Sequence, residues 1–299
     1  MNETVPSRTA LVTALMRSLH SRADPEPLFD DPWGERLVPP MVREAIAARL
    51  GLEPCAPGRE AHIDAFLREL PAYANVVLRC RCTEDALQRA AAAGVGQTVL
   101  VGAGFDTLVL RRGPALAQLA VFEIDHPATQ GLKRQRLADC GVAQPEATHF
   151  IAADLGAEGL ESALRRSPFD FGRPAFFSWL GVTMYLPRAA NFATLAAIAR
   201  CGAPGSELVF TYVDQRAFDA GAASAGFEAL RASVAAVGEP MITGFEPAAL
   251  ARELEALGFE LVEDLDGTQL SRRYAGSGAN RLESSPLSRL AHLRLPARG

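Results

Sequence analysis

The chain has 299 residues, of which 48% are hydrophobic and 22% charged, and its formal net charge is −5. This length suits one large α/β domain with a helical extension, and the composition excludes a fibrous or wholly disordered protein. The acidic balance argues against nucleic acid as the main partner, because phosphate binding requires a basic surface.

Cysteine usage and the chain's first residues predict a cytoplasmic protein. The five cysteines are scattered and odd in number, so we expect free thiols in a reducing compartment. Residues 1–6 lack the apolar stretch of a secretory leader, and no run of about eighteen apolar residues would cross a membrane. The histidines show no metal-ligand spacing, so we expect no metal.

Residues 1–93 are predicted to be helical and to form a lid that also contributes to the substrate site. Ser7 or Thr9 can cap a first helix whose apolar residues recur at helical spacing. Gly51 is predicted to end a later helix, because glycine commonly follows the last residue of a helix. No strand pattern appears before residue 94.

From Gln97 onward strands alternate with helices, which predicts a parallel sheet covered on both faces. We assign residues 94–275 to this core domain. A helix-bearing insertion over 214–244 is expected to cover the substrate, and 276–299 to form a loosely held tail, or else a short docked helix. The predicted strands lie near 97–101, 119–124, 148–152, 175–180, 206–213 and 259–265, with a last strand around 268–274.

The residues that carry chemistry begin where the first strand ends, at Gly102-Ala103-Gly104. Glycine has no side chain to hold a ligand away, so this loop suits a small-molecule site at the carboxyl end of a strand. The next strand should deliver an acid about 20 residues further on to bind ribose hydroxyls. Its tip offers Glu123 and Asp125, and we choose Asp125 because it lies nearest the carboxyl end.

The loop also discriminates between cofactors. A dinucleotide fingerprint needs a third glycine where this chain has Thr107. The nearby acid Asp106 suits an ammonium and a sulfonium better than it suits phosphates, so the charge favours S-adenosylmethionine over NAD. After the third strand, Asp154 can accept from an adenine amino group while Leu155 packs on the ring. A helix N-cap is the alternative role of Asp154.

Several further stretches of the chain carry recognisable motifs. Together with the glycine loop they are Gly102–Thr107, Glu123–Pro127, Trp179–Leu186, Arg79-x-Arg81 and, in the helical N-terminal region (the leader), Ser7–Ala10, Arg17 and Pro27–Pro32. In this order they closely resemble the leucine carboxyl methyltransferase family, and more narrowly its bacterial branch of S-adenosylmethionine-dependent O-methyltransferases. The resemblance covers the chain from about Ser7 to Gly276.

The resemblance implies a class I methyltransferase fold, an α/β Rossmann-like sheet of seven strands with the last strand antiparallel. By position, Arg81 would hold the cofactor carboxylate with Arg79 as a helper. The glycine loop would line the methionine end, Asp125 would bind the ribose, and the residues after the third strand would bind the adenine. The implied cofactor site comprises Arg79, Arg81, Gly102, Ala103, Gly104, Asp125, Asp154, Leu155 and Leu180.

One departure from the family pattern falls inside this site. Family members often carry Glu where this chain has Leu180. A contact between Leu180 and the cofactor must therefore come from its backbone. The departure leaves the acceptor, a small molecule or a peptide, undetermined.

The sequence assigns no catalytic residue. A carboxylate acceptor is already charged, and Arg17 could position it. A hydroxyl acceptor needs a base within about 2.6–3.2 Å, for which His126, Asp214 and Tyr185 are candidates. Plainer roles exist for two of them, because His126 precedes a helix and Tyr185 suits a packed ring.

Two hypotheses of different kinds follow. The leading one is an S-adenosylmethionine-dependent O-methyltransferase. The alternative is a methyltransferase-like fold that binds without catalysing, which Leu180 favours and the retained charged residues disfavour. A nicotinamide dehydrogenase is a weaker third, disfavoured by Thr107.

Overall fold

The computed structural model describes residues 6–111, 113, 116–155, 157–219, 221, 224–278 and 280–296. Two of our expectations concern residues outside this part of the chain. They are the absence of a secretory leader, which rests on residues 1–5, and the last residues of the tail, 297–299. Within the described part of the chain, no helix is long and apolar enough to span a membrane. All five cysteines are free.

Seven strands form one sheet in the order β3-β2-β1-β4-β5-β7-β6. The strands β1 to β5 pair in parallel, whereas β7 runs antiparallel to both β5 and β6. This confirms the predicted α/β fold with an antiparallel last strand. The strands are β1 Gln97–Val101, β2 Ala120–Asp125, β3 Thr148–Ala152, β4 Phe176–Trp179, β5 Glu207–Val213, β6 Glu260–Asp266 and β7 Ser288–Arg294.

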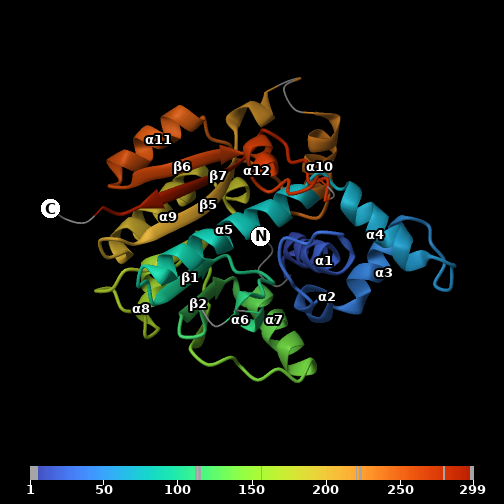
Figure 1. The fold of residues 1–299 in the computed structure, drawn as a ribbon, viewed down its shortest axis with the longest axis horizontal. Helices are drawn as coiled ribbons and strands as arrows, with labels where there is room; N and C mark the ends of the chain where they lie inside the picture. The colour runs from blue at the N-terminus through green and yellow to red at the C-terminus, as the bar shows by residue number, and fades with distance from the viewer. Residues whose placement is uncertain are drawn as a thin grey trace.

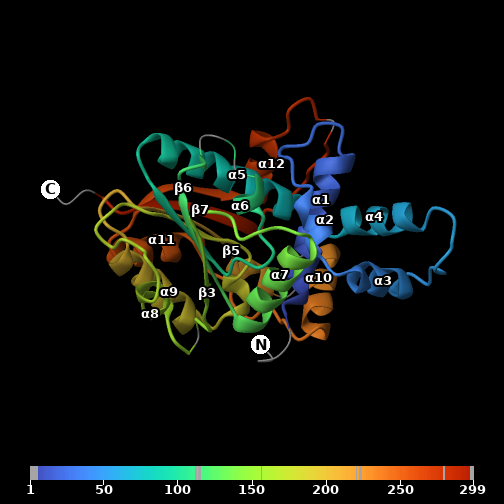
Figure 2. The same ribbon diagram turned by 90° about the horizontal axis from the view of Figure 1, so that it is seen from below.

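Helices cover both faces of the sheet. Figures 1 and 2 show α5 and α12 on one face and α8, α9 and α11 on the other. Successive side chains of β1 pack on opposite faces of the sheet. Leu100 lies in the core under α5, whereas Val99 and Val101 lie in the core under α9. These helices are α5 Tyr73–Ala92, α8 Leu160–Arg165, α9 Arg188–Cys201, α11 Pro247–Ala256 and α12 Gly267–Arg273, with α6 Leu108–Arg111 and α7 Pro127–Asp139 following β1 and β2.

The first six strands lie where the pattern predicted them, but the seventh does not. Residues 268–274 form most of α12, because Asp266 caps this helix and Gln269 returns the bond in a capping box. The last strand is instead β7, inside the segment that we expected to be loosely held. That expectation is wrong for β7, where Leu290 and Leu293 are fully buried on opposite faces of the sheet.

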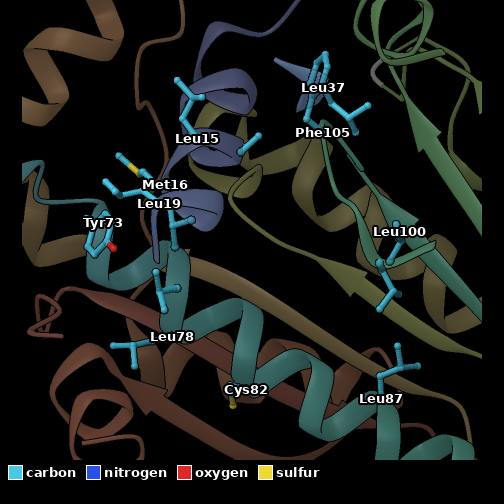
Figure 3. Close-up of a cluster of buried hydrophobic side chains, with 14 of the residues drawn as sticks. Leu15, Met16, Leu19, Leu37, Tyr73, Leu78, Cys82, Leu87, Leu100 and Phe105 are labelled. Carbon is cyan, nitrogen blue, oxygen red and sulfur yellow. The ribbon is translucent and has the colours of Figure 1, made fainter. Parts of the chain in front are cut away.

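The predicted leader helices are confirmed. The cap of α1 is Ser7, whose hydroxyl accepts from the backbone N–H of Ala10 at 3.1 Å. Figure 3 shows Met16 and Leu19 of α1 beside Tyr73 of α5, in a buried cluster that joins the leader to the sheet. Helices α3 and α4 project from the rest of the molecule in Figure 2. The first four helices are α1 Arg8–Ala23, α2 Trp33–Leu37, α3 Pro40–Arg49 and α4 Arg59–Glu69.

The insertion between β5 and α11 carries a helix, as predicted. It contains η3 Gln215–Phe218 and α10 Ala225–Ala236, while residues 220, 222 and 223 lie outside the described part of the chain. The two ends of the insertion meet, because the N–H of Phe245 donates to the carbonyl of Val213 at 2.9 Å. The insertion therefore leaves the sheet and returns to it at the carboxyl end of β5.

Candidate functional site

A cavity of about 1360 Å³ lies at the carboxyl ends of β1, β2 and β4 and extends to α1, α3, α4 and α10. Ligand pockets commonly measure about 300–1,000 Å³, so this one has room for more than one ligand. Eight of the nine predicted site residues line it: Arg79, Gly102, Ala103, Gly104, Asp125, Asp154, Leu155 and Leu180. Arg81 does not.

The glycine loop after β1 is held by neighbours on both sides. Gly102 and Gly104 have φ angles of 68° and 52°, in the left-handed region that side chains rarely adopt. A Cβ at Gly102 would lie 2.6 Å from Cγ2 of Val182, and a Cβ at Gly104 would lie 3.1 Å from the Cβ of Ala10 on α1. The loop has no space for side chains at these two positions, and its backbone faces the cavity.

Asp125, at the end of β2, ties this loop to the next one. One oxygen of its carboxylate accepts from the N–H of Gly104, and the other accepts from the N–H of His126 at 2.6 Å. Burial raises the pKa of Asp125, while these two backbone bonds act in the opposite direction. Asp125, which we predicted to bind the ribose, therefore also fixes the backbone around it.

Glu123 shares the strand face of Asp125 but lies beneath the site. Its carboxylate pairs with Nζ of Lys133 on α7 at 2.5 Å, and both side chains are fully buried. Burial raises the pKa of Glu123, and the charge of Lys133 opposes this shift. Depth along β2, rather than the face of the strand, thus separates the two acids.

Arg79 and Arg81, both on α5, point in different directions. The guanidinium of Arg79 borders the cavity beside Gly181, where an added Cβ would lie 2.7 Å from either terminal nitrogen. Its Nε is buried and has no hydrogen-bond partner among the described residues. Burial also lowers the pKa of Arg79.

Arg81 instead contacts the leader. Its Nη1 donates to the carbonyl of Leu28, and its Nε lies 3.0 Å from Asp85. Residues two apart on a helix do not share a face, so α5 can present only one of the two arginines to the cavity. Of these two arginines, only Arg79 lines the cavity.

Asp154 and Leu155 follow β3 at the edge of the sheet, and Leu180 follows β4, with β2 and β1 between the two strands. The carbonyl of Asp154 accepts from the N–H groups of Ala157 and Glu158 at 3.0 and 2.9 Å, which opens a turn after β3. The N-cap of α8 is Gly159, so the alternative of Asp154 as the cap is wrong. Leu155 packs against the α9 side of the core, whereas Leu180 packs against the α5 side.

The candidate bases are distributed unevenly. His126 borders the cavity, but its Nδ1 accepts from the N–H of Ala128 at 3.3 Å, which confirms its capping role. Asp214 is paired with Arg216 at 2.7 Å and does not line the cavity. Tyr185 lines the cavity, and burial raises its pKa to about 12.

Arg17 is buried rather than solvated. Its Nε donates to Asp31 at 3.0 Å, and its Nη2 donates to the carbonyl of Phe105. Desolvation opposes the charge of Arg17, but Asp31 beside it holds its pKa above the usual value. Arg17 therefore fixes α1 to the residues after the glycine loop, and its charge is already paired.

Sequence reasoning missed Glu239, which joins the insertion to the leader. Its carboxylate accepts from the N–H of Arg8 at 3.0 Å and from the hydroxyl of Thr9. The first turn of α1 contains no acidic residue. Helix N-termini favour nearby negative charge, so Glu239 stabilises this end of α1, and no local pattern in the sequence indicates the contact.

Comparisons with known proteins agree with this geometry. The family model described as "Leucine carboxyl methyltransferase" matches residues 10–199. The "Putative S-adenosyl-L-methionine-dependent methyltransferase YktD" of Bacillus subtilis (strain 168) is 31% identical over 89% of this chain and 90% of its own length. A protein of Mycolicibacterium smegmatis (strain ATCC 700084 / mc(2)155) that carries the same activity in its name is 34% identical over 72% of this chain and 69% of its own length.

A solved structure shares the fold at lower sequence similarity. It is the "putative methyltransferase" of Thermobifida fusca YX, with a TM-score of 0.56 and 20% identity. The likeness covers 85% of this chain and 94% of that chain.

We predict that the protein tolerates the loss of both charges of the buried pair Glu123 and Lys133 far better than the loss of one. Lys133→Met should lower the free energy of unfolding by about 3–5 kcal/mol, because it leaves the Glu123 carboxylate buried without a partner. The double variant Glu123→Leu/Lys133→Met should be close to the parent. Urea unfolding of the three proteins measures these differences.

The loss of unfolding free energy in Lys133→Met should also shrink as pH falls toward 4.5, the usual pKa of a glutamate, because protonation removes the buried charge of Glu123. A raised folded-state pKa contributes stability at low pH that is lost as pH rises through it. A double variant as unstable as the single one would contradict this account.

Proposed function

Because this chain belongs to the leucine carboxyl methyltransferase family and is a methyltransferase that uses S-adenosylmethionine, we propose that it methylates an oxygen atom of its acceptor. The acceptor oxygen would belong to a carboxyl or hydroxyl group of a small molecule or peptide. One observation carries this proposal: Arg79, Asp125 and the glycine loop border a single cavity with room for cofactor and acceptor.

The residues around the cavity fit this cofactor. Arg79 offers a buried cation that borders the cavity, which suits the carboxylate of the methionine end. Asp125 would accept from the ribose hydroxyls, and Asp154 with Leu155 would bind the adenine. Gly102, Ala103 and Leu180 would contribute backbone contacts. When bound, the sulfonium supplies an activated methyl group.

The protein's part in the reaction is orientation and exclusion of water. Transfer of the methyl group to an anionic oxygen cancels the charge of the sulfonium, so the site need not stabilise a developing charge, and positioning of the acceptor is the main requirement. A carboxylate is already anionic, whereas a hydroxyl acceptor must give its proton to solvent before it receives the methyl group. Burial raises the pKa of Tyr185 to about 12, so its hydroxyl keeps its proton at neutral pH and well above it. It can donate a hydrogen bond to the acceptor oxygen, and we assign no general base.

The proposal is tested by titration and by labelling. Calorimetry should detect binding of S-adenosylhomocysteine and none of NAD. Transfer from a donor with a labelled methyl group should give a product whose label is bound to oxygen. Absence of binding to S-adenosylhomocysteine would refute the cofactor site, and binding without turnover on any acceptor would favour a silent binding protein. A label on nitrogen or carbon would refute O-methylation.

The two arginines of α5 form a matched pair of variants. Arg79→Gln should weaken S-adenosylhomocysteine binding by about 10- to 100-fold, because a hydrogen bond to a charged group contributes about 1.5–3 kcal/mol. Arg81→Gln should leave the affinity within about twofold, because that side chain contacts Leu28 and Asp85 outside the cavity. Calorimetric Kd values decide between them, and the reverse order would return the role to Arg81.

Asp125 should act through both the cofactor and the loop. Asp125→Ala is expected to weaken S-adenosylhomocysteine binding by about 1–3 kcal/mol. Asp125→Asn retains one acceptor oxygen for the N–H of Gly104 and should lose less. An unchanged affinity of Asp125→Ala, measured by calorimetry on protein that unfolds at the parent's temperature, would show that a different carboxylate binds the ribose.

A further inference from the structure

We propose that the methyl acceptor is an apolar small molecule, a body of aliphatic or aromatic carbon that carries an oxygen nucleophile at one end. This inference rests on the proposed function and names the substrate class for the same site. The part of the cavity that would hold the carbon body is lined by α3, α4, α10 and residues 237–242, and is called the outer chamber here.

The outer chamber is built from side chains that offer carbon. Its lining includes Val42 and Ile46 from α3 and Phe66 from α4, with Leu230 and Val234 from α10 facing the same cavity. Helices α3 and α4 pack against each other. The start of α10 lies beside the link that follows α4, where an added Cβ on Gly226 would lie 3.4 Å from Pro71. Helices distant in sequence therefore enclose one apolar space.

Exposed hydrophobic side chains concentrate at this chamber. Met41 is 72% exposed, Ile242 53% and Val237 37%, and all three line the cavity. The other large exposed hydrophobic residues in the described chain, Leu261 and Val262, lie together on the strand β6. Clustered exposed apolar groups mark binding surfaces, so the grouping of Met41, Val237 and Ile242 favours an apolar occupant.

The same walls do not suit a peptide. The backbone groups of the helical walls are used within α3, α4 and α10, and the hydroxyl of Ser233 already donates to the carbonyl of Leu230 at 2.8 Å. In the remaining wall, the N–H groups of Gly238, Glu239 and Ile242 already donate to backbone carbonyls. Peptide groups buried there would lose their bonds to water without replacement, which is unfavourable.

Binding of 4-alkylphenols to the protein saturated with S-adenosylhomocysteine tests the inference. Across 4-ethyl-, 4-butyl- and 4-hexylphenol, Kd from calorimetry should fall by about fourfold per added methylene group as carbon is buried. A tripeptide that ends in a free leucine carboxylate should bind more weakly than 4-hexylphenol. Tighter binding of the peptide, or no dependence on chain length, would overturn the inference.

Two aspartate variants of similar exposure locate the site. Ile242→Asp should weaken 4-hexylphenol binding at least tenfold, whereas Leu261→Asp, on the exposed part of β6, should not change it. Both should bind S-adenosylhomocysteine like the parent. Equal effects of the two variants on 4-hexylphenol would overturn the outer chamber as its site. Failure of the parent to bind S-adenosylhomocysteine would instead refute the proposed function, so the two failures are distinguishable.

Discussion

The backbone at the end of β1 imposes the constraint on which the site depends. The chain turns there through two residues with positive φ, Gly102 and Gly104, in a space limited by Val182 on one side and Ala10 on the other. Asp125 fixes this turn by accepting from the N–H of Gly104 and from that of His126. A single carboxylate thus connects the loops after two strands and also lines the cavity, so the geometry of the glycine loop and the shape of the cavity are coupled.

Buried charges extend that organisation away from the loop. Arg17 reaches from α1 to the carbonyl of Phe105 and is neutralised by Asp31, which places the leader over the strand ends. Glu123 and Lys133 join β2 to α7 below the site. Such pairs contribute little net stability, but removal of one partner is costly, so they favour one arrangement of helices over others. The leader is therefore part of the site's architecture rather than an appended cover.

Sequence patterns predicted what local chemistry determines and failed where choices depend on distant partners. Buried strands before glycine turns and an acid at the tip of β2 are local features, so most of the sheet and Asp125 could be predicted. The leucines of β7 fit a strand or a short helix until β5 and β6 provide partners on both sides. Likewise, which of Arg79 and Arg81 faces the cavity depends on how α5 rotates against the sheet, and Glu239 becomes visible only when the insertion meets α1.

The cavity is bounded by parts of the chain that carry different information. Its floor is formed by the motif-bearing strand ends, and these lie within the family match over residues 10–199. Helix α10 and Ile242, which also line the cavity, lie beyond that match. Between them, Glu239 contacts the leader by accepting from the N–H of Arg8. A family name can therefore describe the methyl donor without describing what is methylated. In our proposal the acceptor is selected in the outer chamber, so its chemistry has to be derived from the side chains of α3, α4 and α10 that line it, and they offer carbon.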